Sequence, residues 1–286
     1  MHIAVVIPSR ARPEILGDSL AALSAQTRAP DSIWVGVPSA EDLPDDLGPL
    51  PVTVVHSAPG LTTQRNALVD AATDVDLLVF LDDDAELHPA FLERAEDLAT
   101  RHPDVVLFSG HVVADGVRSR PIERGDARAM LAERKPGDEV VETDHVYGCC
   151  MVVRAETARA VRFDDALPLY GWLEDRDFSR RAARTGRVIE YAGCELVHLG
   201  VSSGRQSGVR MGYQQVVHPV YLRGHRVLSL WEAVYLIGRP VLANVLGAAR
   251  PRPGRIDRRG RLRGNWRGLR SLLTGGARPE EVLRLP

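Results

Sequence analysis

Three consecutive carboxylates, Asp82, Asp83 and Asp84, directly follow the apolar run Leu77–Leu81. Five apolar residues without a turn signal predict a strand that is buried on both faces. Carboxylates at its end raise one another's pKa unless a cation neutralises them. A divalent metal carrying a phosphate would suit this position, because open α/β sheets bind ligands at the carboxyl ends of their strands. The alternative is an acidic turn that opens the next helix, with Asp84 as its N-cap.

Two later segments carry side chains that a metal-assisted reaction would use. Residues 171–177 read Gly-Trp-Leu-Glu-Asp-Arg-Asp, in which Glu174 and Asp175 begin a predicted helix. Acids in a first turn also complement the helix dipole without any catalytic role, so both explanations stay open. His198 ends a predicted apolar strand. A lone histidine is ordinarily structural, and only the surrounding pattern favours a metal ligand.

The first 110 residues alternate strands and helices, which predicts an α/β fold with a mixed, mostly parallel sheet flanked by helices. After residue 110 the pattern loosens, and 115–143 predict loops with a short helix. Strands are predicted at 3–7, 33–37, 52–55, 77–81, 105–108, 145–153 and, as one or two strands, at 188–197. Helices are predicted at 13–23, 61–72, 89–98 and 174–185, and again within 209–248.

The two ends of the chain differ in charge. The net charge is −2, yet residues 201–286 hold 16 arginines against four acids. The segment 227–248 is apolar but interrupted, so it is too broken to span a bilayer. Nine arginines in 250–270, together with Pro and Gly, predict a partly mobile segment that forms little core. Nucleic acid is not an expected partner, because Trp266 is the only aromatic residue among these arginines.

The basic tail has two explanations. It would either lie on the inner face of a membrane as an amphipathic, basic surface, or pack as a helical cap with its arginines in solvent or against a second subunit of a homodimer. The rest of the composition is that of a globular enzyme of 286 residues with 44% hydrophobic and 26% charged residues. Three cysteines, two of them adjacent, favour a reducing cytoplasm, and no signal peptide is expected because Pro8 ends the first apolar run.

Five segments in this order resemble family 2 inverting glycosyltransferases of the GT-A fold. They are residues 6–10, 64–66, the acidic triplet, 171–177 and 197–200. The resemblance covers about residues 1–205 and implies a GT-A catalytic domain there. Its nucleotide-sugar-binding half would be 1–110 and its acceptor and catalytic half 111–205, followed by a C-terminal helical, arginine-rich extension at 206–286.

The resemblance implies a single displacement that moves a sugar from a UDP- or dTDP-linked donor to an acceptor hydroxyl on a glycan, a lipid carrier or a small molecule. Asp82 and Asp84 would form the metal-binding pair, with His198 as the third ligand of Mn²⁺ or Mg²⁺, which neutralises the departing diphosphate. Asp175, beside Glu174, would take the acceptor proton. The remaining implied contacts are Pro8, Ser9, Arg10, Arg65, Asp82 and Asp83 to the donor, and Trp172 and Asp177 to the acceptor.

One departure from the family leaves the base of the donor open. The family usually has an aspartate after the second strand, whereas residues 36–39 read Gly-Val-Pro-Ser, so Glu41 or Asp42 would have to substitute. Two other functions are alternatives. A sugar-nucleotide nucleotidyltransferase would usually show a glycine-rich loop after the first strand, but the first glycine here is Gly17. A catalytically silent nucleotide-binding protein on this scaffold would tend to lose the acids or the histidine.

Overall fold

The computed structural model describes residues 1–117, 119–201, 203–204, 206–249 and 256–286. It contains two compact units. The first comprises Met1–Pro59, Thr63–Phe163 and Phe178–Gly204, and the second comprises Gly60–Thr62, Asp164–Asp177 and Arg205–Pro286. The segment with Glu174 and Asp175 therefore groups with the C-terminal helices. Arg250, Arg252 and Arg255 of the predicted arginine-rich tail lie outside the described residues.

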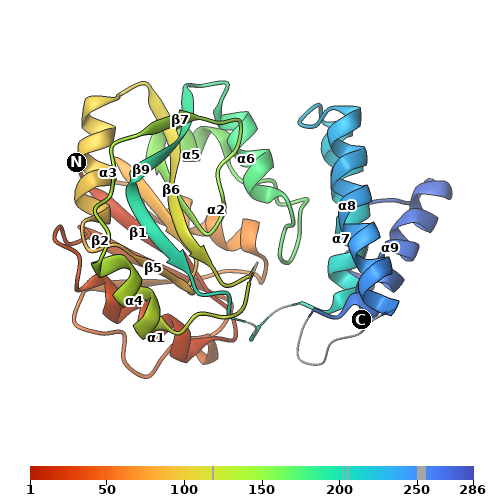
Figure 1. The fold of residues 1–286 in the computed structure, drawn as a ribbon, viewed down its shortest axis with the longest axis horizontal. Coiled ribbons are helices and arrows are strands. Elements are labelled where there is room, and N and C mark those ends of the chain that lie inside the picture. The colour runs from red at the N-terminus through yellow and green to blue at the C-terminus, as the bar shows by residue number, and fades with distance from the viewer. Residues whose placement is uncertain (118, 202, 205, 250–255) are drawn as a thin grey trace. The chain divides into compact units, whose positions relative to one another are not determined.

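In the described residues, the first unit is built on one nine-stranded mixed sheet in the order β3-β2-β1-β4-β8-β6-β9-β5, with β7 paired to β9 (Figure 1). The neighbours β3, β2, β1 and β4 are parallel, whereas β8 is antiparallel to both β4 and β6. The strands are β1 (Ile3–Pro8), β2 (Ser32–Val37), β3 (Val52–His56), β4 (Leu77–Leu81), β5 (Ala85–Leu87), β6 (Val105–Asp115), β7 (Val140–Glu142), β8 (Cys150–Arg154) and β9 (Arg187–His198).

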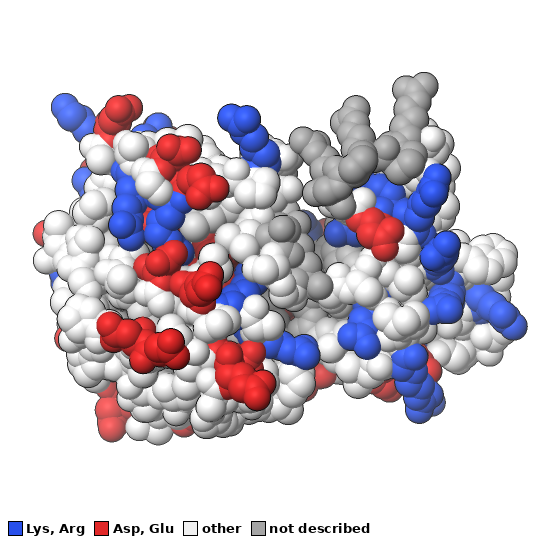
Figure 2. All heavy atoms as spheres, turned by 90° about the horizontal axis from the view of Figure 1, so that it is seen from below, with Lys and Arg blue, Asp and Glu red and all other residues white. Residues whose placement is uncertain are grey.

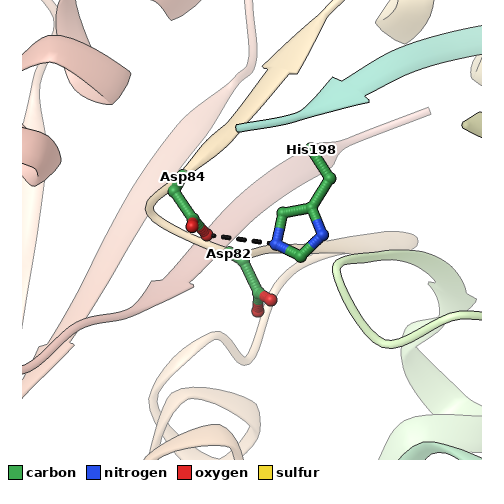
Figure 3. A group of neighbouring side chains, drawn as sticks. All are labelled: Asp82, Asp84 and His198. Atoms are coloured by element: carbon green, nitrogen blue, oxygen red, sulfur yellow. Dashed lines mark ion pairs between the residues drawn. The ribbon is translucent and has the colours of Figure 1, made fainter. Parts of the chain in front are cut away.

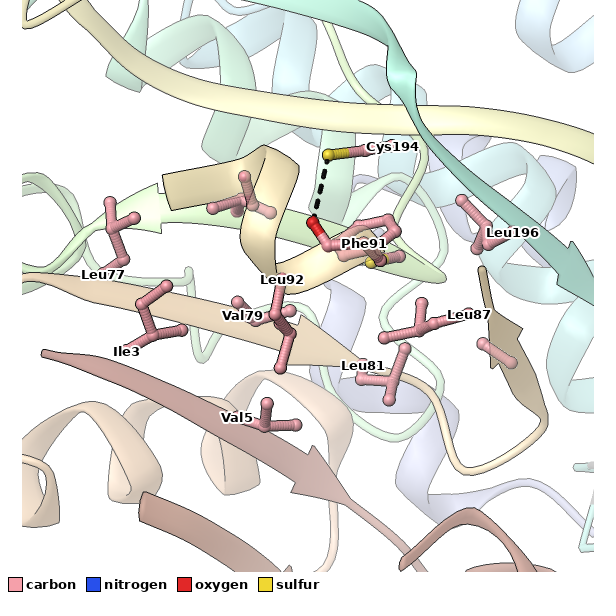
Figure 4. Packing of buried hydrophobic residues seen from close by; sticks show 14 of the residues in the cluster. Ile3, Val5, Leu77, Val79, Leu81, Leu87, Phe91, Leu92, Cys194 and Leu196 are labelled. Atoms are coloured by element: carbon pink, nitrogen blue, oxygen red, sulfur yellow. Dashed lines mark hydrogen bonds between the residues drawn. The ribbon is translucent and has the colours of Figure 1, made fainter. Parts of the chain in front are cut away.

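Helices cover both faces of this sheet, because its central strands are apolar on both sides. Side chains of a strand alternate between faces, so Ile3, Val5 and Ile7 of β1 join one core and Ala4 and Val6 join the other. The first core is closed by α1 (Pro13–Leu23) and α3 (Phe91–Arg101), as Figure 4 shows around Phe91 and Leu92. The second is closed by α2 (Leu61–Ala71), α5 (Ala155–Val161) and α6 (Glu174–Ala182). The predicted fold class is confirmed.

Several boundaries differ from the sequence prediction. β5 and β7 are three residues each, too short to leave a periodic pattern. β8 begins at Cys150 rather than at 145, and the predicted short helix is α4 (Arg124–Ala132). β6 continues to Asp115, well past Phe108, where the prediction ended it. Its second half is half-buried or exposed and is interrupted by register shifts against β9, so the apolar pattern that marks a strand fades there.

The second unit is helical, with α7 (Gly208–Gly224), α8 (Leu230–Ala249), α9 (Arg258–Leu273) and the short 3₁₀ helix η2 (Pro279–Arg284). The expectation of a poorly ordered segment is wrong for residues 258–270, which form most of α9. Glycines allow this helix to pack closely against α7. A side chain at Gly264 would come within 2.0 Å of the Val209 carbonyl oxygen, and one at Gly212 within 2.0 Å of the Arg261 carbonyl oxygen, so the two backbones of α7 and α9 touch.

A buried polar network joins the three helices. Asn244 of α8 donates to Gln215 at 2.9 Å and to the side-chain oxygen of Asn265 at 2.8 Å, and it accepts from Arg258 at 3.0 Å. Buried amides that satisfy one another favour a single helix register. None of the helices in the described ranges is long and apolar enough to cross a membrane.

The glycine packing of α9 is directly testable. Gly264→Ala should lower the free energy of unfolding by about 1–3 kcal/mol, because the added methyl group overpacks the α7 backbone. Gly238→Ala on α8 is the matched control, since no heavy atom lies within 4 Å of the position that its methyl group would occupy. That change should instead stabilise the chain by about 0.5–1 kcal/mol. Chemical denaturation followed by circular dichroism would measure both, and equal effects would contradict the close approach of α9 to α7.

Candidate metal centre

Asp82, Asp84 and His198 bring ligand atoms within 4.8 Å of one another. Figure 3 shows the three side chains, with the ion pair between Asp84 and His198. The two aspartates lie in the turn between β4 and β5, and His198 is the last residue of β9. β5 pairs antiparallel with β9 and places Ala85 opposite His198. Strand pairing therefore brings the histidine to residues that lie more than a hundred positions earlier in the chain.

The three acids of the triplet have different environments. The Asp84 carboxylate accepts the Val201 N–H at 2.8 Å and lies 3.4 Å from Nε2 of His198. Burial raises its pKa, but the hydrogen bond and charge of His198 outweigh burial, so the Asp84 pKa is lowered. Asp82 is the most open of the three and pairs with Arg65 at 3.4 Å. Burial nevertheless raises the Asp82 pKa to about 6, despite the opposing charge of Arg65.

Asp83 turns away from the other two acids. Its carboxylate accepts from the Ser9 hydroxyl at 2.6 Å and from Arg12 at 2.7 Å. Burial raises the Asp83 pKa above its usual value, although Arg12 and Ser9 oppose this shift. The triplet thus divides: Asp82 and Asp84 point to His198, and Asp83 ties the turn to the loop that follows β1.

His198 is held in place by a second layer of polar groups. Its Nδ1 lies 3.2 Å from Asp115 and 3.2 Å from the Tyr147 hydroxyl, which also donates to Asp115 at 3.3 Å. Burial lowers the His198 pKa, but the bonds to Asp115 and Asp84 outweigh it and raise the pKa to about 10. A carboxylate behind the histidine is the usual arrangement at metal sites, because it fixes the ring and leaves Nε2 for the ion.

These residues fit a divalent cation. Two carboxylates and the imidazole of His198 converge in a largely buried site. Two oxygens and one nitrogen make half of an octahedral shell, which leaves positions for water and phosphate oxygens. An ion here would also remove the repulsion between Asp84 and Asp82 that contributes to the raised pKa of Asp82.

Two glycines allow Asp115 and His198 to lie side by side at the ends of β6 and β9. A side chain at Gly116 would come within 2.0 Å of the Leu199 carbonyl oxygen. Gly200 adopts φ +74°, where a side chain would also come within 2.3 Å of the Gly116 carbonyl carbon. Only glycine combines this backbone conformation with this close approach.

The residues predicted to contact the donor lie around β1 and β4. Pro8 ends β1, and Ser9 is buried, with its carbonyl oxygen accepting from Gln64 at 2.9 Å. Arg10 is exposed. Ser9 also reaches Asp83, so the structure brings this part of the predicted donor site together.

Arg65 is buried rather than solvated. It is 1% exposed, and its guanidinium lies against the rings of Phe80 and Phe163, at 5.9 and 5.2 Å from the ring centres. It donates to the Gly148 carbonyl oxygen at 2.8 Å and pairs with Asp82. The positive charge of Arg65 therefore lies beside the metal cluster.

Of the two acids expected to substitute for the missing aspartate after β2, Asp42 is already engaged. Both oxygens of Asp42 are engaged, one by the Ala11 N–H at 2.6 Å and the other by the N–H and hydroxyl of Ser39 at 3.0 Å. Asp42 therefore fixes the loop after β1. Glu41 is exposed and is the better candidate for an acid that contacts the nucleotide base of the donor.

The remaining predicted residues belong to the second unit. Glu174 and Asp177 are buried in the first turn of α6, at 6% and 2% exposure, whereas Asp175 is half-exposed. Among these three acids, Asp175 is the one that keeps access to solvent. Trp172 is also half-buried. Leu173, directly before α6, adopts φ 74°, an unusual conformation for a leucine that is often found near functional sites.

Helix α7 holds the loop that carries these residues. The His218 ring contacts the Trp172 carbonyl oxygen through Nδ1 at 2.8 Å, Gln214 donates to the Pro168 carbonyl oxygen at 3.0 Å, and Tyr221 donates to Asp164 at 2.8 Å. Burial lowers the His218 pKa to about 4, so the ring is neutral and Nδ1 carries the proton that Trp172 accepts. The C-terminal helices are thus part of the support of the Glu174–Asp175 segment.

Sequence reasoning missed Arg12, Asp115 and Tyr147. Arg12 sits two residues beyond the predicted donor loop, and its acidic partner Asp83 is known only from the fold. Asp115 lies in the half of β6 that the apolar pattern does not mark. Tyr147 precedes β8 and had no motif to identify it.

Residues 4–162 match the sequence profile of Glycosyl transferase family 2. The chain belongs to this family. A curated relative, the glucosyl-dolichyl phosphate glucuronosyltransferase of Haloferax volcanii, is 28% identical over 160 residues, which are 52% of this chain and 51% of that protein. The chain thus spans about half the length of this relative. The family that the sequence predicted is thus confirmed.

Solved structures place this chain in the GT-A fold. One is Staphylococcus aureus TarS, residues 1–349, with a TM-score of 0.56 and 13% identity over 99% of this chain and 82% of that one. Another is the mannosyltransferase PcManGT of Pyrobaculum calidifontis in complex with GDP-Man and Mn²⁺, with a TM-score of 0.54 and 15% identity over 99% of this chain and 85% of that one. At this identity the likeness concerns the fold.

Asp115 provides a test of the metal centre that leaves the three ligands intact. Asp115→Asn should weaken Mn²⁺ binding about 10- to 100-fold, because the His198 ring loses the carboxylate that orients it. Isothermal titration calorimetry of the purified glycosyltransferase would measure the affinity. Asp97→Asn, an exposed acid on α3, is the matched control and should bind Mn²⁺ as the parent does. Unchanged affinity in Asp115→Asn would contradict the arrangement described for His198.

Proposed function

We propose that this glycosyltransferase is metal-dependent and inverting, and that it moves a hexosyl group from a UDP- or dTDP-linked sugar to an acceptor hydroxyl by a single displacement. The observation that carries the proposal is the convergence of Asp82, Asp84 and His198 at the end of β4. A divalent ion bound there would act as a Lewis acid on the leaving diphosphate. Membership of the family argues against the nucleotidyltransferase alternative.

The proposed ion is Mn²⁺ rather than Mg²⁺. Mg²⁺ is a hard cation that prefers oxygen ligands, whereas the site offers an imidazole nitrogen as one of its three ligands. Mn²⁺ accepts such a mixed set more readily. The neighbouring PcManGT structure contains Mn²⁺ with its sugar nucleotide, which supports the same choice.

The proposed donor site lies along the carboxyl ends of β1 and β4. Pro8 and Ser9 would lie beside the nucleoside, Asp82 would face the ribose, and Arg10 would approach the phosphates. The donor contact predicted for Asp83 stays a prediction, because Ser9 and Arg12 already engage both of its carboxylate oxygens. Arg65 would act by fixing Asp82, since the guanidinium is already buried against it. The engaged Asp42 leaves the recognition of the base to Glu41 or to backbone groups.

Asp175 is the proposed catalytic base. A single displacement requires the acceptor hydroxyl to lose its proton, and a carboxylate is a suitable proton acceptor. The half-exposed position of Asp175 supports this role, while burial of Glu174 assigns to it the support of the helix start. Trp172 would stack on the acceptor sugar. The acceptor contact predicted for Asp177 stays a prediction, and its burial favours a structural role.

A lipid-linked glycan is the acceptor that we propose among the three classes. The name of the Haloferax volcanii relative describes a transfer to a glucosyl-dolichyl phosphate, which supports an acceptor of this kind. We further propose that the enzyme works in the cytoplasm at the inner face of the membrane. A homodimer stays a prediction.

The base assignment predicts a large effect on turnover with little effect on donor binding. Asp175→Asn should lower kcat about 10²- to 10⁴-fold, because the amide cannot accept the acceptor proton. Donor affinity, measured by calorimetry with Mn²⁺, should stay within about twofold of the parent value if Asp175 acts only on the acceptor. Asp165→Asn, an exposed acid of the same unit, is the matched control. Parental turnover in Asp175→Asn would show that another group is the base.

Donor binding can be tested by thermal shift without knowing the acceptor. UDP, dTDP, GDP and their sugar conjugates should be screened with Mn²⁺ and, separately, with EDTA. A donor present at 100 times its Kd should add about 2.7 kcal/mol of stability. Stabilisation should require Mn²⁺ and should disappear in Asp84→Asn but persist in Asp97→Asn. If no nucleotide stabilises the parent with Mn²⁺, the proposed donor class is wrong.

A further inference from the structure

The outward side of α9 combines an apolar stripe with a row of positive charges. Its inward side is made of small or polar residues that pack within the helical unit. Trp266 is 68% exposed and Leu273 is 88% exposed. With Leu262 and Leu269 they recur at intervals of four, three and four residues, which places all four on one side of the helix. Large apolar side chains at such exposure imply a partner that covers them.

Positive charge flanks this stripe. The helix has six arginines and no acidic residue. Four of these arginines are exposed, and none of the four forms an ion pair with any carboxylate of the described residues. Figure 2 shows blue side chains spread over the helical part of the chain between white surface. The four are Arg259, Arg263, Arg267 and Arg270.

We propose that this side of α9 docks on an anionic lipid bilayer, with the helix lying in the plane of the membrane surface. The bilayer face is defined as Leu262, Trp266, Leu269 and Leu273 together with the four arginines above. The apolar stripe would enter the boundary between headgroups and acyl chains, and the arginines would pair with lipid phosphates. The indole ring of Trp266 suits that depth, because it has an apolar body and one polar N–H.

Charge argues for lipid rather than for a second copy of the chain as the occupant. A symmetric dimer would place the same surface against itself, so the arginines of one copy would face those of the other. An anionic bilayer instead offers negative charge at the rim and apolar chains at the centre. Long arginine side chains can lie along the apolar surface while their guanidinium groups reach the phosphates.

A comparison with helix α8 of the same unit shows why the arginines of α9 favour lipid as the partner. It also exposes large apolar residues, among them Trp231 at 79% and Leu246 at 64%. Its outward side carries a single basic residue, Arg239. An apolar stripe of that kind does not specify its partner, whereas the stripe of α9 is matched to a negative surface.

Vesicle flotation of the full-length protein tests the proposal. Vesicles of phosphatidylcholine with about 30% phosphatidylglycerol should carry the protein to the top of the gradient at low salt, and pure phosphatidylcholine vesicles should carry much less. Binding should fall as NaCl rises from about 0.05 M to about 0.5 M, because salt screens the arginines. Failure to float with anionic vesicles at low salt would overturn the proposal.

Two variants separate this face from general basic charge. Arg259→Gln/Arg263→Gln/Arg270→Gln should lower the partition coefficient about 100-fold, since each arginine near the surface contributes about a factor of five to ten. The matched control removes the same charge at exposed arginines outside α9. It is Arg101→Gln/Arg187→Gln/Arg284→Gln, and it should bind nearly as the parent does. Equal losses in the two triple variants would overturn the proposal.

The apolar stripe has its own test and control. Trp266→Ser/Leu273→Ser should reduce flotation, whereas Val141→Ser/Leu283→Ser, at two other exposed apolar sites, should not. Light scattering of each protein without lipid would reveal self-association. If the parent is a dimer that the Trp266→Ser/Leu273→Ser variant converts to a monomer, the occupant is a second copy and the lipid proposal fails. Sugar transfer to a soluble acceptor should be unchanged in all these variants, which keeps this test independent of the catalytic assignment.

Discussion

The site depends on the mutual repulsion of three adjacent carboxylates at the end of a buried strand. Three basic side chains reduce this repulsion. Arg12 neutralises Asp83, Arg65 approaches Asp82 from within the core, and His198 approaches Asp84 from the end of β9. Asp82 and Asp84 still form a pair of neighbouring acids that would bind a cation. A divalent ion would complete this arrangement.

The packing of the sheet holds these charged side chains in place. β4 is buried on both faces, so the turn that follows it cannot shift without disturbing two cores. The side chain of Arg65 lies against two aromatic rings. The second strand that reaches the site, β9, is held close to β6 by the close approach of Gly116 and Gly200. Rigid strands on each side give a site that is organised before any ligand arrives.

The inner and outer surfaces of the helical unit have different roles. Its inner polar contacts from α7 hold the turn before α6, so the unit supports the segment with Asp175 rather than being a detachable tail. Its outer surface carries the exposed arginines of α9. The same short helix uses glycines on one side to reach the α7 backbone and arginines on the other to meet its partner, which explains a composition that looks unsuitable for a folded helix.

The sequence by itself determined the α/β class, the buried strand that ends in Asp82–Asp84, and the family, because these rest on local apolar runs and on ordered motifs. Only the tertiary structure decided what surrounds them. Asp115 reaches His198 through pairing between strands far apart in the chain, and α9 packs closely on another helix through its glycines. Such contacts depend on register and on close backbone approach. Neither leaves a periodic signal in a single sequence.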